Sequence, residues 1–304
     1  MNKILLPNSI IGYFNRSPQE NTRVTDFWCS SDNPNLYKIN REKMGESWFY
    51  KDTEESLTYT FNSQGHRNAL DLQDFPEDYG LGIGCSLTAG VGIHKHDTFL
   101  EQVSEKIHVP IYNAGIPAAS NEIGVFNLLS LITIKKPQFV IFQITQRSRL
   151  THKKSINNYS PINVLGSWTV KNKSIALETK ETQTVPQNSE NMSITHESDY
   201  FIRQIESGAN NFKHLLSIHM VVSICQLLHI PLILIEGLDT FIELPYEQKN
   251  YVLIDKSYFK DPLYFQSTHK PECMARDLIH PGPQANERLA NIIIEKLDGV
   301  RSQY

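Results

Sequence analysis

The stretch Tyr79-Gly-Leu-Gly-Ile-Gly-Cys-Ser-Leu-Thr-Ala-Gly-Val-Gly92 is the part of the chain from which the fold is best interpreted. Its first half has apolar residues at alternate positions, which is typical of a strand. The pattern ends at Gly84-Cys85-Ser86, where glycine permits a sharp turn into a small-residue segment that can enter a helix. This predicts a strand that presents Ser86 at its end. A buried strand followed by a glycine-rich turn fits the same residues.

A repeating order of strand and helix continues along the chain. Thr98 and Glu101 fit a capping box for a helix with apolar residues at four-residue spacing. Further elements are predicted as strands at 109–113, 139–142, 231–236 and 251–254, and as helices at 121–134, before residue 228 and from Pro283 onward. Such alternation favours a parallel sheet with right-handed crossovers and helices on both faces. The predicted fold is therefore a three-layer α/β/α domain with about five parallel strands.

The first part of the chain differs in character from the rest. Residues 1–77 are polar and aromatic, and we expect them to form an N-terminal elaboration packed on a main domain at 78–304. Within this elaboration, residues 48–50 and 57–60 flank an acidic turn. Their pattern predicts a hairpin.

The main domain contains an expected insertion at about residues 151–196, where Lys, Asn, Ser and Thr predominate. A structureless loop of this length is unusual in a compact domain. The insertion is therefore interpreted either as a lid beside a site or as surface decoration. Residues 168–170 and 175–177 are candidates for a hairpin within it.

Composition limits the class of protein. With 304 residues, of which 40% are hydrophobic and 20% charged, the chain is long enough to bury a full core. A net charge of -4 without long basic runs argues against nucleic acid as a partner. Neither a signal peptide nor a membrane segment is expected, because the first apolar run is broken at Pro7 and no other is long enough. The cysteines are expected to be reduced thiols, since they are widely spaced: Cys29, Cys85, Cys225 and Cys273.

A histidine stands in a loop just before the last predicted helix, in Ala275-Arg-Asp-Leu-Ile-His-Pro-Gly-Pro283. Loops that follow the strands of parallel sheets often carry sites. Asp277 can fix the tautomer of His280 and leave the other ring nitrogen as a base, although the two residues fit a helix-entry salt bridge equally well. Together with Ser86 they supply a nucleophile, a base and an orienting carboxylate.

In their order along the chain, these motifs resemble the blocks of the SGNH or GDSL hydrolases. The first block, Gly-Asp-Ser-Leu, is similar to Gly84-Cys85-Ser86-Leu87, the second matches Asn113-Ala114-Gly115, and the last, Asp-x-x-His, matches residues 277–280. The resemblance extends over about residues 78–298. It implies a flavodoxin-like three-layer fold, hydrolysis of an ester, and an oxyanion-hole amide at Gly115.

Two positions depart from the family pattern. Cys85 replaces the aspartate of the first block, which is expected to alter local hydrogen bonds more than the reaction, and Cys85 as nucleophile is a rival hypothesis. The third block, Gly-x-Asn-Asp, corresponds by position to Ile144-Thr145-Gln146-Arg147 and lacks the oxyanion asparagine. Gln146 is the expected replacement donor, with Thr145 or Arg147 as alternatives. Loss of one such donor typically costs about 100-fold to 1,000-fold in rate.

The predicted function is a serine esterase that removes a small acyl group, expected to be acetyl, from a carbohydrate. Ser86, Asp277 and His280 are the predicted catalytic residues, and the oxyanion donors are expected to be Ser86, Gly115 and Gln146. No cofactor or metal is expected. Two arginines are candidate substrate-binding residues, Arg67 and Arg147, and Arg67 is alternatively a structural anchor that forms a salt bridge.

Other interpretations stay open. A catalytically weak or inactive SGNH-fold module that binds carbohydrate or is structural, for instance in a larger assembly, fits the altered third block, and acyl transfer to a sugar is a further possibility. His94, His96 and Asp97 either hold a metal ion or form a solvated surface. The elaborated chain also resembles SGNH-like proteins of bacteria and their viruses. That resemblance implies a cytoplasmic or virion-associated protein, and it leaves the oligomeric state open.

Overall fold

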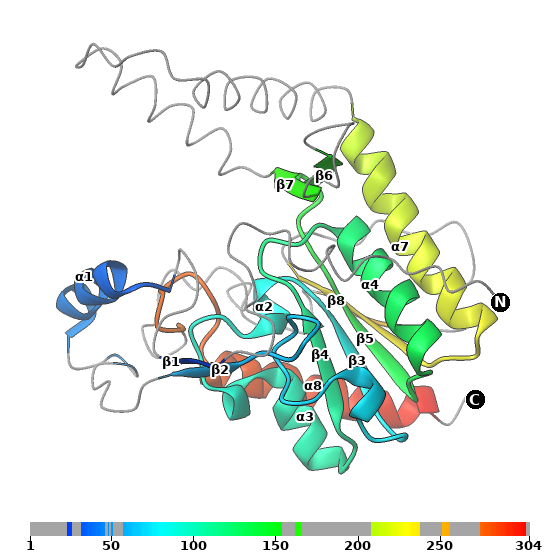
Figure 1. Cartoon of the computed structure of the whole chain (residues 1–304), viewed down its shortest axis with the longest axis horizontal. Helices are drawn as coiled ribbons and strands as arrows, with labels where there is room; N and C mark the ends of the chain where they lie inside the picture. Colours follow the sequence, from blue (N-terminus) through cyan, green and yellow to red (C-terminus); the bar gives the residue numbers. More distant parts are fainter. Residues whose placement is uncertain are drawn as a thin grey trace.

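A five-stranded parallel sheet with helices on both faces forms the centre of the molecule (Figure 1). The strand order is β4 (Ile111–Gly115), β3 (Gly80–Gly84), β5 (Phe139–Ile144), β8 (Leu232–Glu236) and β9 (Tyr251–Ile254). This is a computed structural model, and it describes residues 23–25, 32–45, 48, 50, 57–153, 162–165, 208–237, 251–255 and 274–301. The predicted α/β fold with five parallel strands is confirmed.

The packing around strand β3 explains why its sequence is rich in glycine. Leu81 and Ile83 belong to the core on one face of the sheet. On the other face, a Cβ at Gly80 would lie 2.3 Å from the Phe139 ring, and one at Gly82 would lie 2.3 Å from Leu100. The alternating glycines therefore make room for large side chains of the neighbouring strand and helix.

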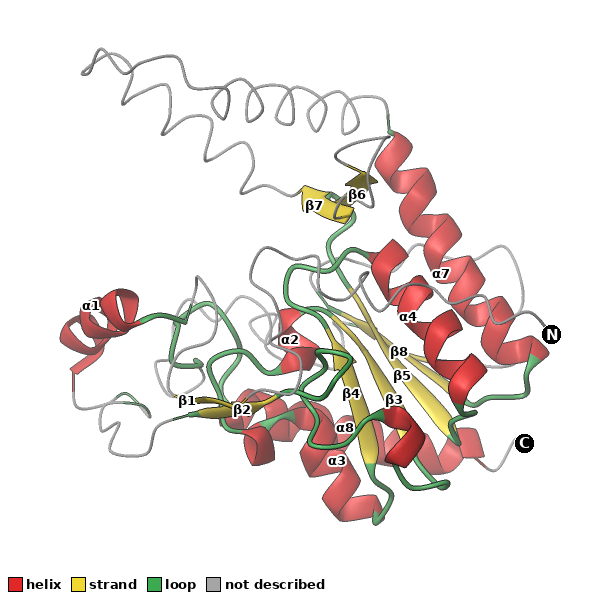
Figure 2. Ribbon diagram, in the orientation of Figure 1, coloured by secondary structure: helices red, strands yellow, loops and turns green. Residues whose placement is uncertain are grey.

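Two helices cover each face of the sheet (Figure 2). α4 (Asn121–Ile134) and α7 (Ala209–Leu227) lie on one face, and α3 (Phe99–Ile107) and α8 (Pro283–Arg301) lie on the other. The Thr98 hydroxyl accepts from the N–H of Glu101 at 3.3 Å, so α3 begins with the predicted cap. No helix in the described part of the chain is long and apolar enough to cross a bilayer.

The hairpin predicted near residues 48–60 falls partly outside the described residues, and its described part does not form it. Strand β2 (Thr58–Thr60) pairs with β1 (Arg23–Thr25) in antiparallel orientation, so its partner lies much earlier in the chain. Trp48 and Tyr50 are buried in an aromatic cluster that also contains Tyr59, Ile93 and Ala275. The aromatic residues were misread as strand residues because a buried cluster and a strand are built from the same side chains. Helix α1 (Pro34–Met44) precedes this cluster.

The remaining elements are short. A two-stranded antiparallel sheet of β6 (Leu150–Lys153) and β7 (Ile162–Leu165) stands at the start of the expected insertion. The hairpin predicted around 168–177 lies outside the described residues. The short helices are η3 (Leu72–Asp74), α2 (Ser86–Ala89) and η4 (Lys95–Asp97).

Candidate active site

Ser86 is the first residue of α2, directly beyond the end of β3. Its carbonyl accepts from the N–H groups of Gly90 at 3.0 Å and Val91 at 3.1 Å, so the chain folds back on the serine within one turn. Gly90 has φ 73°, a left-handed conformation that suits glycine. The side chain of Ser86 is 9% exposed, and among the described residues neither its hydroxyl nor its N–H has a hydrogen-bond partner.

The turn is supported by Gln143 on β5, which sequence reasoning missed. The Gln143 side-chain oxygen accepts from the Thr88 hydroxyl at 2.6 Å and from the Cys85 thiol at 3.8 Å. Cys85 is fully buried with its thiol on this oxygen, which contradicts the rival hypothesis that it is the nucleophile. The available signal was a polar residue inside an otherwise apolar strand, Phe139–Ile144, because buried polar groups need partners.

The N–H of Gly115, the predicted oxyanion donor, has a hydrogen-bond partner in this structure. Its N–H donates to the side-chain oxygen of Asn113 at 2.9 Å, and Asn113 also donates to the Thr88 carbonyl at 3.0 Å. A Cβ at Gly115 would lie 2.4 Å from the Ala89 nitrogen, so the glycine lets α2 approach β4. The chain turns later, at Ala118 with φ 63°, whose N–H makes no hydrogen bond within the described ranges.

Asp277 and His280 form a tight pair in the loop before α8. His280 Nδ1 lies 2.5 Å from Asp277 Oδ2. Asp277 Oδ1 accepts from the N–H groups of Ile279 and His280 at 3.0 Å each. Leu278 adopts φ 54°, and this left-handed residue turns the chain so that the carboxylate faces these three donors.

The electrostatics of this pair favour the ionised form of Asp277. Burial alone raises the pKa of Asp277, but the His280 ring and the two amides outweigh it, so the pKa lies below its usual value. An ionised carboxylate on Nδ1 places the ring proton there. The pair therefore leaves Nε2 of His280 as the nitrogen that can act as a base.

The loop that contains Asp277 and His280, called the histidine loop below, lies against the segment that follows Ser86. Arg276 N–H donates to the Gly92 carbonyl at 2.9 Å, and a Cβ at Gly92 would lie 3.4 Å from the Asp277 nitrogen. The N–H of the adjacent Val91 donates to the Ser86 carbonyl. The turn that begins at Ser86 and the loop of Asp277 and His280 thus share a boundary, although Ser86 and His280 are not hydrogen-bonded to each other in this structure.

Arg67 is a structural anchor, which corrects its candidate role in substrate binding. Its guanidinium is 2% exposed and donates to the carbonyls of Ala89 at 3.0 Å, Gly90 at 2.6 Å and Ile93 at 2.9 Å. It also lies 4.5 Å from the centre of the Tyr59 ring. Arg67 therefore holds the turn after α2 through carbonyl groups, in place of the expected salt bridge.

The residues after β5 differ in what they offer to the site. The Thr145 hydroxyl donates to the Ala119 carbonyl at 3.0 Å, so it is not free to act as the alternative oxyanion donor. Arg149 donates to the same carbonyl at 3.0 Å, which ties this segment to the turn after β4. Gln146 and Arg147 lie between these anchors and are half-buried.

His94, His96 and Asp97 do not converge on a common point. The two imidazole rings stack with centres 5.2 Å apart, and His96 Nε2 lies 3.7 Å from Asp97 Oδ1. Where the structure describes the chain, it places no group of three or more His, Cys, Asp or Glu side chains to hold a metal ion.

Comparison with models of known protein families gives no match, and comparison with curated proteins gives none. Solved structures do match. The crystal structure of TesA is 13% identical, with 73% of this chain and 99% of that chain covered and a TM-score of 0.41. A putative lipolytic protein of the G-D-S-L family from Desulfitobacterium hafniense is 13% identical, with 73% and 98% covered and a TM-score of 0.37.

An acetylxylan esterase from Geobacillus stearothermophilus, solved as a catalytic mutant, is 13% identical, with 72% of this chain and 94% of that chain covered and a TM-score of 0.39. A further match is described as an SGNH-hydrolase family esterase, at 13% identity with 74% and 98% covered and a TM-score of 0.34. These solved structures, to which this chain is similar, are described as GDSL or SGNH proteins and esterases, and the α/β fold of this chain is shown by its own five-stranded sheet.

Proposed function

We propose that the protein is a serine esterase in which Ser86 is the nucleophile, His280 the general base and Asp277 the carboxylate that orients it. The observation that carries the proposal is the Asp277–His280 pair at 2.5 Å, in a loop that borders the Ser86 turn. The Asp277 carboxylate is buried, and both of its oxygens accept hydrogen bonds from residues of this loop. A helix-entry salt bridge at the surface would not need such burial.

The reaction proceeds in two displacements. His280 Nε2 takes the Ser86 proton as the serine oxygen attacks the ester carbonyl, and the protonated ring then gives that proton to the leaving alcohol. Water next attacks the acyl-serine with His280 again as base. The serine oxygen recovers a proton, and the acyl group leaves as a carboxylic acid. Asp277 stabilises the imidazolium in both steps.

The oxyanion requires hydrogen-bond donors at the carboxyl ends of the strands. The N–H groups of Ser86 and Ala118 are proposed for this role, because neither has a partner among the described residues. The half-buried side chain of Gln146 remains the proposed third donor. Arg147 is proposed to contact the substrate beside it.

The proposed substrate is a short acyl ester, with acetyl on a carbohydrate as the preferred case. Small residues surround the turn, which suits a short acyl group: Ala89, Gly90, Ala118 and Ala119. The SGNH-like motifs support an ester on a sugar or a similar carrier.

A fluorophosphonate probe tests the proposal directly. Attack by Ser86 forms an oxygen–phosphorus bond and expels fluoride, while His280 accepts the serine proton. We expect wild type and Cys85→Ala to be labelled on a peptide that contains Ser86, and Ser86→Ala to stay unlabelled. Ser86→Ala should also lower the turnover of a small acetyl ester by about 1,000-fold or more. Equal labelling of Ser86→Ala and wild type would remove the serine from the mechanism.

A second candidate is an inactive module that binds carbohydrate. It is favoured by one observation, the missing hydrogen bond between Ser86 and His280. Apo enzymes often have loose catalytic contacts that tighten with substrate, so this geometry does not exclude catalysis. A folded wild type that binds acetylated glycans and resists the probe would establish the module.

A further inference from the structure

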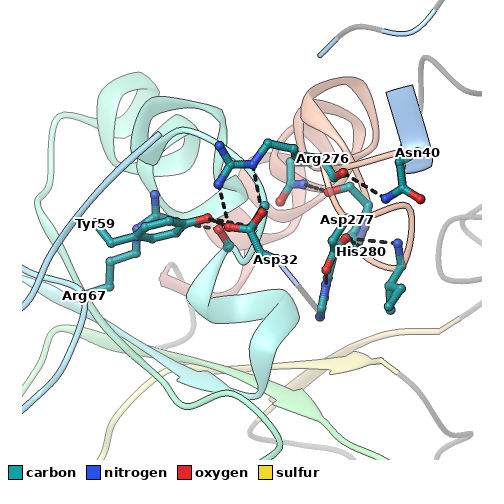
Figure 3. A network of polar contacts seen from close by, with 12 residues as sticks. Asp32, Asn40, Tyr59, Arg67, Arg276, Asp277 and His280 are labelled. Atoms are coloured by element: carbon teal, nitrogen blue, oxygen red, sulfur yellow. Dashed lines mark hydrogen bonds and ion pairs between the residues drawn. The ribbon is translucent and has the colours of Figure 1, made fainter. Parts of the chain in front are cut away.

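A closed ring of hydrogen bonds joins residues from four separate places in the sequence (Figure 3). Asp32 accepts from the Tyr59 hydroxyl at 2.7 Å and from Arg276 Nε and Nη2 at 2.8 Å each. The Tyr59 oxygen accepts from the N–H of Gly92 at 3.0 Å. The Gly92 carbonyl accepts from the Arg276 N–H at 2.9 Å, which closes the ring.

This ring connects the two halves of the candidate site. Arg276 directly precedes Asp277, and Gly92 follows the Val91 N–H that donates to Ser86. Gly92 is held through both backbone groups, by Tyr59 on its N–H and by Arg276 on its carbonyl. A movement of Arg276 away from Gly92 would therefore break a bond of the ring.

The aromatic ring of Tyr59 also supports the turn after α2, through its contact with Arg67. It faces the Arg67 guanidinium at 4.5 Å, a cation–π distance. Arg67 in turn donates to carbonyls on both sides of the turn after α2, at Ala89 and Ile93. Tyr59 is thus a member of the hydrogen-bond ring and also contacts Arg67, which anchors the turn after α2.

The members of the ring are buried polar groups in a region that already has an apolar core. Asp32 is 1% exposed, and Tyr59 and Arg276 are 0% exposed. The aromatic cluster around Trp48 packs in the same region. Removing charges from water offsets much of the attraction within a buried ion pair, so stability alone explains the ring poorly. A bidentate arginine–carboxylate pair does, however, fix distance and orientation.

We propose that Asp32 and Tyr59 are positioning residues that hold the Asp277–His280 loop in register with Ser86, an inference that rests on the proposed esterase function. Both residues belong to the N-terminal elaboration. In this proposal, that segment acts on the reaction through the residues that it positions. A displacement of about 1 Å at a reacting group can cost about 100-fold in rate. A ring that fixes the distance between the two loops would prevent such a displacement.

Tyr59→Phe is the decisive variant, because it removes the hydroxyl that belongs to the hydrogen-bond ring and keeps the aromatic ring that faces Arg67. Tyr37→Phe is the matched control. It removes the hydrogen bond from Tyr37 to the Tyr50 carbonyl at 2.8 Å, in the same segment, and leaves the ring of Asp32, Tyr59, Gly92 and Arg276 intact. Asp32→Asn is a second variant that disrupts the bidentate pair. The measurements are kcat and KM for a small acetyl ester and the rate of fluorophosphonate labelling. They are made at a temperature where circular dichroism finds each variant folded.

We expect folded Tyr59→Phe to lose about 10-fold to 100-fold in kcat and in labelling rate, with KM changed by less than about 3-fold. Tyr37→Phe should match wild type. The double variant Tyr59→Phe with Asp32→Asn should lose less than the product of the single effects, because both act on one ring.

Two negative results are distinguishable. If wild type is labelled at Ser86 and folded Tyr59→Phe keeps the wild-type kcat and labelling rate, the ring is only structural and the inference is overturned. If folded wild type is not labelled at all, the esterase function fails, and the inference fails with it.

Discussion

Opposing effects act on the Asp277 carboxyl group. Burial raises its pKa, and the His280 ring with the amides of Ile279 and His280 lowers it further than burial raises it. A carboxylate whose pKa is lower in the folded state stabilises the fold above its unfolded pKa of about 4. That stabilisation is lost as the pH falls through the lower, folded value.

We therefore expect Asp277→Asn to be less stable than wild type by about 1–3 kcal/mol at pH 7, because it leaves buried donors with a weaker acceptor. The difference should shrink as the pH falls below about 4. Urea unfolding at pH 7 and pH 3 measures it. Asp78→Asn is the control, since Asp78 is exposed. A difference that is the same at both pH values would contradict this account.

Single residues differed in how far the sequence could define them. The Asp277–His280 contact was predictable because its partners are three residues apart and one turn brings them together. Arg67 was not, because the same side chain fits a substrate contact or an anchor until its burial and its carbonyl partners are known. Gln143 gave a signal, a polar residue in an apolar strand, but no indication of its partner.

Among the elements, the contact between β4 and α2 depends on the missing side chain at Gly115. A Cβ there would lie 2.4 Å from the Ala89 nitrogen and 2.8 Å from the Thr88 carbonyl carbon. Both are backbone atoms, so the strain is relieved only if α2 shifts. Replacing Gly115 with alanine keeps the N–H of residue 115. The substitution therefore tests the packing of α2 against β4 without removing a donor for an oxyanion.

Gly115→Ala should destabilise the fold by about 1–3 kcal/mol, the usual effect of overpacking, and displace the Ser86 turn enough to reduce activity. Gly299→Ala on α8 is the control, since a Cβ there meets nothing within 4 Å and alanine favours a helix. Thermal unfolding and labelling rate are the measurements. Wild-type stability in Gly115→Ala would disprove the close packing.

Element boundaries were predictable from the sequence where the pattern was local. Helix α4 and strand β9 have the bounds predicted for them, 121–134 and 251–254, because apolar spacing and flanking residues define both. The partner of β2 could not be predicted in that way. Pairing of Thr58–Thr60 with Arg23–Thr25 depends on the tertiary contacts that bring the two segments together.

At the scale of the whole molecule, the hydrogen-bond ring joins residues from both ends of the chain. Arg276 and Asp32 are separated by 244 positions, and no local pattern connects them. The parallel sheet was predictable from alternating strands and helices, and so were the turn at Ser86 directly after a strand and the loop of His280 before the last helix. The ring that joins those two loops was not, because buried polar contacts depend on the packed arrangement.

The polar interior also predicts how the molecule responds to acid. His66 is 0% exposed, with Nδ1 3.0 Å from the Tyr112 hydroxyl, and burial lowers its pKa to about 4. The unfolded chain has the ordinary value of about 6.5, so between pH 6.5 and 4 the unfolded state binds the proton more readily. His66 therefore makes the fold lose stability as the pH falls through that window.

Since one unit of pKa difference is worth about 1.4 kcal/mol, His66 should account for about 3 kcal/mol of stability lost between pH 7 and pH 4. Replacing it with a group that does not titrate should remove that part of the pH dependence. We expect the unfolding free energy of His66→Gln, measured in urea across this range, to vary less with pH than that of wild type. His96→Gln, at a histidine whose side chain is 69% exposed, should keep the wild-type dependence. Parallel pH curves for wild type and His66→Gln would show that His66 is not the group responsible.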